Sequence, residues 1–207
     1  YHPIIEALAN KQSKYFIVVI TKAGLIKRMD LDDFLNTTPS GILYSKLNQG
    51  DYVKDIVIAN HKSDVIIYTK SKALRISIND IPYLKRSTLG ATSIKSPEGI
   101  DGISVITAET KDVIIVTAKG RFNRISQSAL ERTTRGKAGS KVIKLLKGDY
   151  IQNVFTCSSN TIIHCVHADN TTTDIQSESI NMGSSVSSGE KLTKEIIKAE
   201  LVVPVKM

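Results

Sequence analysis

The stretch VIIVTAKGRFNRI, residues 113–125, joins an apolar β-branched run to a Lys-Gly turn and then to a basic-apolar run. The same order recurs in IVVITKAGLIKRM (17–29) and VIIYTKSKALRIS (65–77), and a weaker copy is IIHCVHADNTTTDI (162–175). The turn threonines of the first three copies are 48 residues apart. A strand-rich period near fifty is typical of propeller-like or solenoid arrays, in which each unit buries its apolar face against its neighbours. The sequence therefore predicts an all-β, propeller-like fold.

The four copies divide the chain into units, which we expect at residues 13–61, 62–110, 111–159 and 160–207. Within a unit the pattern predicts one blade of about four strands, with a long polar loop between the second strand and the third. The expected third and fourth strands lie at 42–47 and 52–59, at 92–95 and 103–108, and at 141–145 and 150–157. Helix is expected only as short turns, such as 31–35. Unit four has lost the Lys-Gly turn, which is typical of an atypical terminal repeat.

The two ends of the chain carry separate expectations. Residues 1–12 are expected to form a linker or a closing strand, and 202–205 are a candidate strand that pairs with the first blade. The chain lacks an initiating Met, so we expect it to be part of a longer protein. No apolar run approaches eighteen residues, and the opening YHPIIEALANKQ does not resemble a secretory signal. Two cysteines are too few for a disulfide framework, which fits a reducing cytosol.

Positive charge is concentrated in one unit. The chain has a net charge of +8, which favours a polyanionic partner. Residues 111–159 carry ten Lys or Arg against three acids, whereas residues 160–207 carry four against six. Units one and two are close to balanced. A polyanion is therefore expected to be held most strongly across units two and three and released near unit four.

Hairpin turns and the strands that follow them supply a repeated set of cations. Because turn residues lie at the rim of an array of hairpins, we expect a curved basic edge that contacts phosphates of duplex DNA. The turns contribute Lys22, Lys70, Lys72 and Lys119, and the adjoining strands and loops contribute Lys27, Arg28, Arg75, Lys85, Arg86, Arg121 and Arg124. A simpler interpretation also stands, in which lysines at hairpin tips only keep the turns hydrated and blunt strand edges.

The loop ERTTRGKAGSK, residues 131–141, is the densest basic segment. Its four cations are Arg132, Arg135, Lys137 and Lys141. Gly136 and Gly139 lie between them, and we expect these glycines to let backbone N–H groups approach a phosphate closely. The loop has no aromatic residue, which argues against base stacking on single strands. Backbone contacts to a duplex are the favoured interpretation.

These repeats resemble a known family. ITKAGLIKRMDLDDF, VTAKGRFNRI and the turns LNQGDYV and LLKGDYI are similar to the C-terminal β-pinwheel domain of the DNA-cleaving subunit of bacterial type IIA topoisomerases, DNA gyrase and topoisomerase IV. The similarity extends over roughly residues 13–200. It implies blades that exchange strands with their neighbours and a basic rim that bends or wraps duplex DNA. The loop at 131–139 departs from the Q-R-R-G-G-K-G box of gyrase, which favours a topoisomerase IV-like or divergent member.

The resemblance also implies what the chain does not do by itself. The catalytic tyrosine of such enzymes lies in another domain, so this chain is expected to carry no catalytic residue and no cofactor. ATP and Mg²⁺ would be used elsewhere in the parent enzyme. The implied partners are duplex DNA, the ATPase subunit, and the catalytic core of the same subunit, without a membrane. The implied location is the bacterial cytoplasm, in association with the nucleoid.

The residues themselves also bear on a metal-binding role and on an enzymatic role. Cys157, His164, Cys165 and His167 match none of the familiar zinc-ligand spacings, and neighbouring strand residues point to opposite faces, so no metal site is expected. No nucleophile-base grouping or phosphate-binding loop appears, which argues against an enzyme. The remaining alternative is a propeller that serves as a protein-interaction platform, with incidental basic charge.

Overall fold

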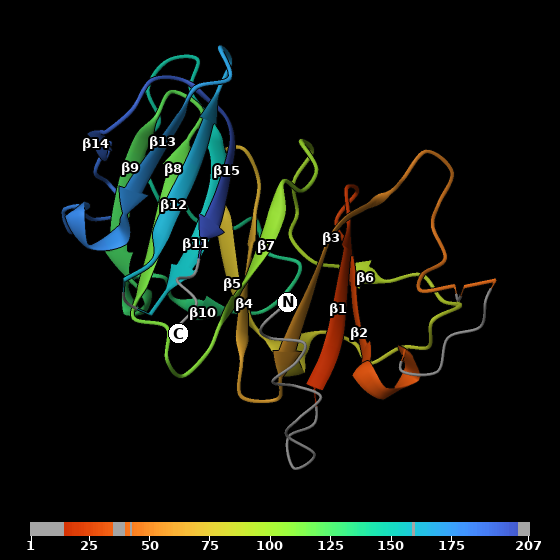
Figure 1. The fold of residues 1–207 in the computed structure, drawn as a ribbon. Coiled ribbons are helices and arrows are strands. Elements are labelled where there is room, and N and C mark those ends of the chain that lie inside the picture. The colour runs from red at the N-terminus through yellow and green to blue at the C-terminus, as the bar shows by residue number, and fades with distance from the viewer. Residues whose placement is uncertain (1–14, 35–39, 42, 159, 203–207) are drawn as a thin grey trace.

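The structure, a computed structural model, describes residues 15–34, 40–41, 43–158 and 160–202. These residues form four small β-sheets, or blades, which succeed one another along the molecule (Figure 1). Four short 3₁₀ turns are the only helical elements of the described chain. The predicted all-β, propeller-like fold is confirmed. The linker or closing strand expected at 1–12 lies outside the described residues, as do 203–205.

Each unit begins with a hairpin, as the repeat predicted, and most of its boundaries agree with the sequence. Unit one has β1 (Tyr15–Thr21), β2 (Leu25–Asp30), η1 (Leu31–Phe34) and β3 (Val53–Asn60). Unit two has β4 (Asp64–Tyr68), β5 (Ala73–Ser77), η2 (Ile78–Asp80), β6 (Ala91–Thr92) and β7 (Gly102–Ile106). Unit three has β8 (Asp112–Thr117), β9 (Arg121–Ser126), η3 (Gln127–Ala129), β10 (Arg132–Thr133) and β11 (Ile151–Cys157). Unit four has β12 (Ile162–His167), β13 (Thr172–Gln176), η4 (Ser177–Ser179), β14 (Glu190–Lys191) and β15 (Ile196–Val202).

The outermost strand of each of the first three blades comes from the following unit. The strand orders are β3-β1-β2-β6, β10-β5-β4-β7, β11-β8-β9-β14 and β13-β12-β15. Leu25 pairs with Thr92, Arg75 with Arg132, and Phe122 with Glu190. We call the segments that cross to the preceding blade arms: residues 81–101, 130–150 and 180–195. Strand exchange, implied by the resemblance, is thus a feature of this chain.

The arms seal apolar cores that lie between blades. One cluster joins Ile26 of blade one and Ile67 of blade two to Ile94 of the arm at 81–101. The next joins Ile66 of blade two to Val113 of blade three and to the arm at 130–150. Neighbouring residues of β4 therefore face different cores, which explains why its sequence is continuously apolar. Each fully buried Ile contributes about 1.5–3 kcal/mol.

The exchange also explains where the expected strands were wrong. Residues 43–47 form no strand, and neither do 141–145, while β10 lies inside the segment predicted to be a loop. An arm bonds its host blade through only two residues of regular strand, and side-chain burial anchors the rest. Val142 and Ile143, for example, are each 1% exposed in an irregular segment.

Blade four differs from the others because it has three strands. Residues 202–205 were expected to pair with the first blade. At Val202 this is wrong, because Val202 ends β15 and lies opposite Ile162 of β12 in blade four. The opposite edge of the sheet is β13, which pairs only with β12 within the described chain. The described array therefore has two unlike ends (Figure 1).

Candidate nucleic-acid interface

The predicted basic residues fall into three classes of exposure. The exposed ones are Lys70, Lys85, Arg132, Arg135, Lys137 and Lys141. The half-buried ones are Lys22, Arg28, Lys72, Arg75, Arg86, Lys119, Arg121 and Arg124. Lys27 alone among them is buried, with 1% of its surface exposed. Exposure therefore ranks these cations by how much of each side chain solvent can reach.

The arginines of the second strands hold the following unit in place. Arg75 Nε donates to Asp64 at 2.8 Å, and its Nη1 donates to the carbonyl of Gln127 in η3 at 2.8 Å. Arg124 repeats this arrangement with Asp112 at 2.6 Å and the carbonyl of Ser177 at 3.3 Å. Each guanidinium thus links its own blade to the 3₁₀ turn from which the next arm departs. These arginines, which were expected one strand inward of the basic edge, therefore lie at a junction between blades, and their contact with DNA stays a prediction.

Arg28 occupies the same position in blade one. It lies opposite Val18, as Arg124 lies opposite Ile114. Its Nη1 donates to the side chain of Asn79 in η2 at 3.2 Å, and its guanidinium carbon lies 4.7 Å from the centre of the Phe16 ring. Arg28 is therefore another junction residue.

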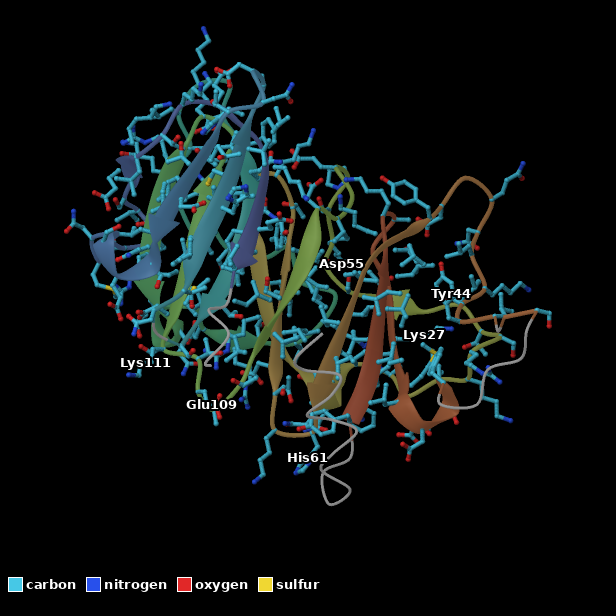
Figure 2. The ribbon with its side chains drawn as sticks, in the orientation of Figure 1. Lys27, Tyr44, Asp55, His61, Glu109 and Lys111 are labelled. Carbon is cyan, nitrogen blue, oxygen red and sulfur yellow. The ribbon has the colours of Figure 1, made fainter. Side chains whose placement is uncertain are left out.

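Lys27 is a buried structural cation. Its Nζ donates to the backbone carbonyls of Lys85, Arg86 and Thr88 at 3.2, 2.8 and 2.8 Å. Burial lowers the pKa of its ammonium group. In Figure 2, Lys27 lies beside blade one, on the side where the arm at 81–101 passes. Its ammonium is thus enclosed by the protein and bonded to three carbonyls, an arrangement that does not favour the DNA contact predicted for Lys27.

The turn lysines also reach across junctions. Lys22 Nζ donates to the carbonyl of Ile100 at 2.8 Å and to the carboxylate of Asp101 at 3.0 Å. Lys70 Nζ lies 5.2 Å from the centre of the Tyr150 ring. Each lysine therefore contacts the next unit through its ammonium group.

The corresponding cations of unit three have similar contacts. Lys119 Nζ donates to the carbonyl of Lys147 at 2.9 Å, within the same unit. Arg121 Nε donates to the carbonyl of Ser188 in unit four at 2.7 Å. These cations are half-buried and engaged with carbonyl oxygens, unlike the exposed loop that follows.

The basic loop of unit three is more structural than its sequence indicated. Arg132 Nε donates at 3.0 Å to Asp64, the same buried carboxylate that binds Arg75. The N–H of Gly136 donates to the carbonyl of Ser93, so it is not available to a phosphate. A Cβ on Gly139 would come within 2.8 Å of the carbonyl oxygen of Ala73. The expected role of these glycines is corrected: they seat the arm against unit two and its arm.

Backbone hydrogen bonds join the long loop of unit one to the first arm and each arm to the next. The N–H of Lys46 donates to the carbonyl of Thr88 at 3.3 Å, that of Lys95 to Lys137 at 2.8 Å, and that of Lys144 to Ser187 at 2.8 Å. These bonds connect segments that are far apart in the sequence into one continuous band.

The band carries exposed cations, and we call this set the arm belt. It consists of Lys46, Lys85, Lys95, Arg135, Lys137, Lys141 and Lys144. None of them forms an ion pair with another residue that the structure describes. Positive charge on the arm belt is therefore left for a ligand.

Three members of the arm belt were missed by the sequence interpretation. Lys46, Lys95 and Lys144 are 49 residues apart, and each follows a glycine by five residues. Aligning the arms as well as the hairpins would have found them. Lys194 holds the equivalent place in unit four, but its ammonium is paired with Asp169. The arm belt thus weakens at unit four.

The residues weighed for metal binding have other roles. The described residues contain no group of three or more His, Cys, Asp or Glu that could hold a metal ion. Cys157 and Cys165 are buried free thiols, and burial raises the pKa of each to about 11. His167 Nδ1 lies 2.8 Å from the carbonyl oxygen of Glu195, and His164 Nδ1 lies 2.6 Å from Asp174.

Comparison with known proteins agrees with the strand-exchanged blades. The family model described as "DNA gyrase C-terminal domain, beta-propeller" matches residues 15–60 and 111–158, which are units one and three. These two units of the chain are therefore similar to this family. Units two and four lie outside these two matches, although their hairpins repeat the same register.

Individual relatives carry related names. The A subunit of DNA gyrase from Metamycoplasma arthritidis is 25% identical over 73% of this chain and 19% of the relative. The corresponding protein of Haloquadratum walsbyi is 29% identical over 64% of this chain and 16% of the relative. The chain therefore spans less than a fifth of the length of these relatives.

Solved structures show the same fold. A topoisomerase IV C-terminal domain has a TM-score of 0.84 at 17% identity, covering 93% of this chain and 63% of that domain. A DNA gyrase A C-terminal domain has a TM-score of 0.77 at 20% identity, covering 94% and 66%. In the part of the chain that the structure describes, no helix has the length and apolar character needed to cross a membrane.

Proposed function

We propose that this chain is an accessory module that binds duplex DNA along the arm belt and bends it. The observation that supports the proposal is the belt itself: exposed cations without ion-pair partners among the described residues, on successive segments that backbone hydrogen bonds join to one another. Such a surface suits a phosphate backbone, which needs charge and reach rather than a unique fit. Binding should therefore depend little on sequence.

The bend should be uneven along the array. Six of the seven belt cations lie in units two and three, whereas Lys191 and Lys194 of unit four are engaged with Lys119 and Asp169. DNA should be held most strongly across units two and three and released near unit four. Bending would cost a few kcal/mol over roughly 20–30 base pairs, and the additional phosphate contacts offset that cost.

The module would act within a longer protein. Because the relatives are DNA gyrase proteins, we place this activity in a type IIA topoisomerase. Its partners would be an ATPase subunit, together with the cleavage core that belongs to the same polypeptide. ATP and Mg²⁺ would be used by those other parts. The enzyme would work in the bacterial cytoplasm, on the nucleoid.

The test compares two double variants with the same change in charge. Arg135→Ala/Lys137→Ala removes two cations of the arm belt, and Lys191→Ala/Lys194→Ala removes two cations of unit four. Affinity for a duplex of about 30 base pairs is measured from roughly 50 to 300 mM salt by fluorescence anisotropy. The belt variant should flatten the plot of log K against log salt by roughly 1.8, at about 0.9 for each phosphate that is no longer neutralised. The unit-four variant should leave the slope nearly unchanged.

Two results would count against the proposal. Equal reductions of affinity in both variants would show that binding follows net charge alone, and absence of binding at low salt would remove DNA as the ligand. Bending itself is read from energy transfer between dyes on the two ends of the duplex, which should rise on binding.

A protein-interaction role has one specific observation in its favour. Leu43, Tyr44 and Tyr52 of unit one are 61%, 41% and 53% exposed, and Tyr44 lies at the end of the molecule away from blade four (Figure 2). Exposed apolar groups gathered in one region are typical of a surface that contacts another protein. This second candidate predicts binding that changes little with salt, so the same titration separates the two functions.

A further inference from the structure

The Lys85–Arg86 segment is folded around a cation that belongs to a different unit. The carbonyls of Lys85, Arg86 and Thr88 all accept from the single Nζ of Lys27, on β2 of unit one. No other side-chain donor reaches the carbonyls of Arg86 and Thr88 within the described chain, whereas Lys85 also accepts from Thr88 Oγ1 at 2.7 Å. The ammonium is therefore the centre around which this part of the arm bends.

The charged side chains of the same segment border a hollow. Lys85 is exposed, and the Arg86 guanidinium carbon lies 5.9 Å from the centre of the Phe34 ring. Both line an open hollow of about 590 Å³ together with Asp33 and Leu43. The carbonyls thus face a buried cation while the charged groups of the same residues face the hollow.

The residue at the position of Lys27 differs in the other blades, and so do the bonds that fasten the arm at each junction. Lys27 lies opposite Val19 in its hairpin, and the residues in the same register are Leu74 opposite Ile67 and Asn123 opposite Ile115. Asn123 Nδ2 donates to the carbonyls of Val142 and Ser184, in two different arms, at 3.0 and 2.9 Å. Leu74 makes no such bond, and there Arg132 fastens the arm to Asp64 instead. A buried donor at this position is a device for shaping an arm.

We infer that Lys27 is a positioning residue, which sets the conformation of the Lys85–Arg86 segment of the next unit and thereby its contact with DNA. The part of this inference that concerns contact with DNA rests on the proposed function, and the part that concerns the conformation of the segment does not. Thr88 adds a second link, because its carbonyl also accepts from the N–H of Lys46 at 3.3 Å. Lys27 thus supports the arm belt at the point where units one and two meet.

The first experiment follows the segment without DNA. Lys27→Met keeps the apolar stem and removes the donor, which leaves three carbonyls without it. Trypsin cleaves after Lys85 and Arg86 only when the segment opens, so cleavage there should accelerate about tenfold or more. Cleavage after Lys62, in an exposed turn, is the internal reference and should not change. Unchanged cleavage after Lys85 and Arg86 would overturn the inference.

The second experiment is a mutant cycle read in DNA binding. Lys27→Met alone should flatten the salt slope by about 1 to 2, as Lys85→Ala/Arg86→Ala does, since up to two phosphates are no longer neutralised. The triple variant should bind no more weakly than the double variant, because Lys27 acts through these two side chains. Fully additive reductions of affinity would contradict the inference.

A folding defect is handled by a second substitution. If Lys27→Met does not fold, Lys27→Leu is used, because leucine fills the equivalent position 74 at 2% exposure. Global unfolding of both variants would overturn the inference in favour of a purely structural role. If the unaltered chain binds no DNA, the proposed function fails, and the cleavage experiment still decides whether Lys27 holds the segment.

Discussion

At the scale of single residues, the junctions depend on buried charge. Asp64 has 2% of its side chain exposed and accepts from Arg75 of its own blade and from Arg132 of the following arm. A buried carboxylate is costly unless it is paired, and removing one member of such a group leaves the other charges without compensation. The carboxylate is therefore more important to this fold than an ion pair at the surface.

We expect Asp64→Ala to destabilise the chain by about 3–5 kcal/mol, because it leaves a half-buried guanidinium without its acceptor. The free energy of unfolding is measured by urea denaturation followed by far-ultraviolet circular dichroism. The control is Glu200→Ala, which breaks the exposed Lys198–Glu200 pair and should leave the unfolding curve in place. Similar curves for both variants would show that Asp64 is not structurally special.

At the scale of elements, the close approach of an arm to its host hairpin is decided by backbone contact. Gly120 has φ +75° and lies against the segment 192–194, and its carbonyl accepts from the N–H of Leu192 at 3.1 Å. A Cβ at this position would collide with the carbonyl oxygens of Thr193 and Lys194. Gly136 has a similar φ of +78°, but a Cβ there would meet nothing within 4 Å. A side chain at Gly136 would therefore meet only the cost of a positive φ, whereas a side chain at Gly120 would meet that cost and a clash with backbone as well.

Gly136→Ala should destabilise the chain by about 1–2 kcal/mol, which is the cost of a positive φ alone. Gly120→Ala should cost roughly 3 kcal/mol or more, because overpacking against rigid backbone is added to the same strain. Thermal melting of both variants gives the comparison. If the two variants melt together, backbone contact between arm and hairpin contributes little to stability.

At the scale of the whole molecule, the two described ends of the array are chemically different. In the first three blades the second strand carries Arg28, Arg75 or Arg124, which hold the next unit. In blade four the same register position is Asp174, opposite His164 and bonded to it. A carboxylate cannot donate to the carbonyls of an arm, so blade four lacks the side-chain donor that holds an arm in the other three blades.

We therefore expect the amides of β13 to exchange with deuterium faster than those of β2, β5 and β9. In those strands the outer amides donate to an arm, as the N–H of Ala73 does to Ser140 at 2.9 Å, whereas β13 lacks such a partner among the described residues. The central strands β4, β8 and β12 serve as references and should be similarly protected. Equal protection of β13 and β9 in hydrogen-exchange mass spectrometry would contradict this expectation.

The sequence by itself determined the repeat, the all-β class and the hairpins, because these depend on local patterns: a β-branched run, a turn residue and a strand period of two. It also placed unit three at the centre of positive charge. Only the tertiary structure decided which strand completes which blade, since exchange is a contact between residues distant in the sequence, such as Leu25 and Thr92. For the same reason, only the tertiary structure showed that Lys27 is buried and Arg135 is exposed. Both are cations in the sequence, but the neighbouring unit encloses the first and leaves the second exposed.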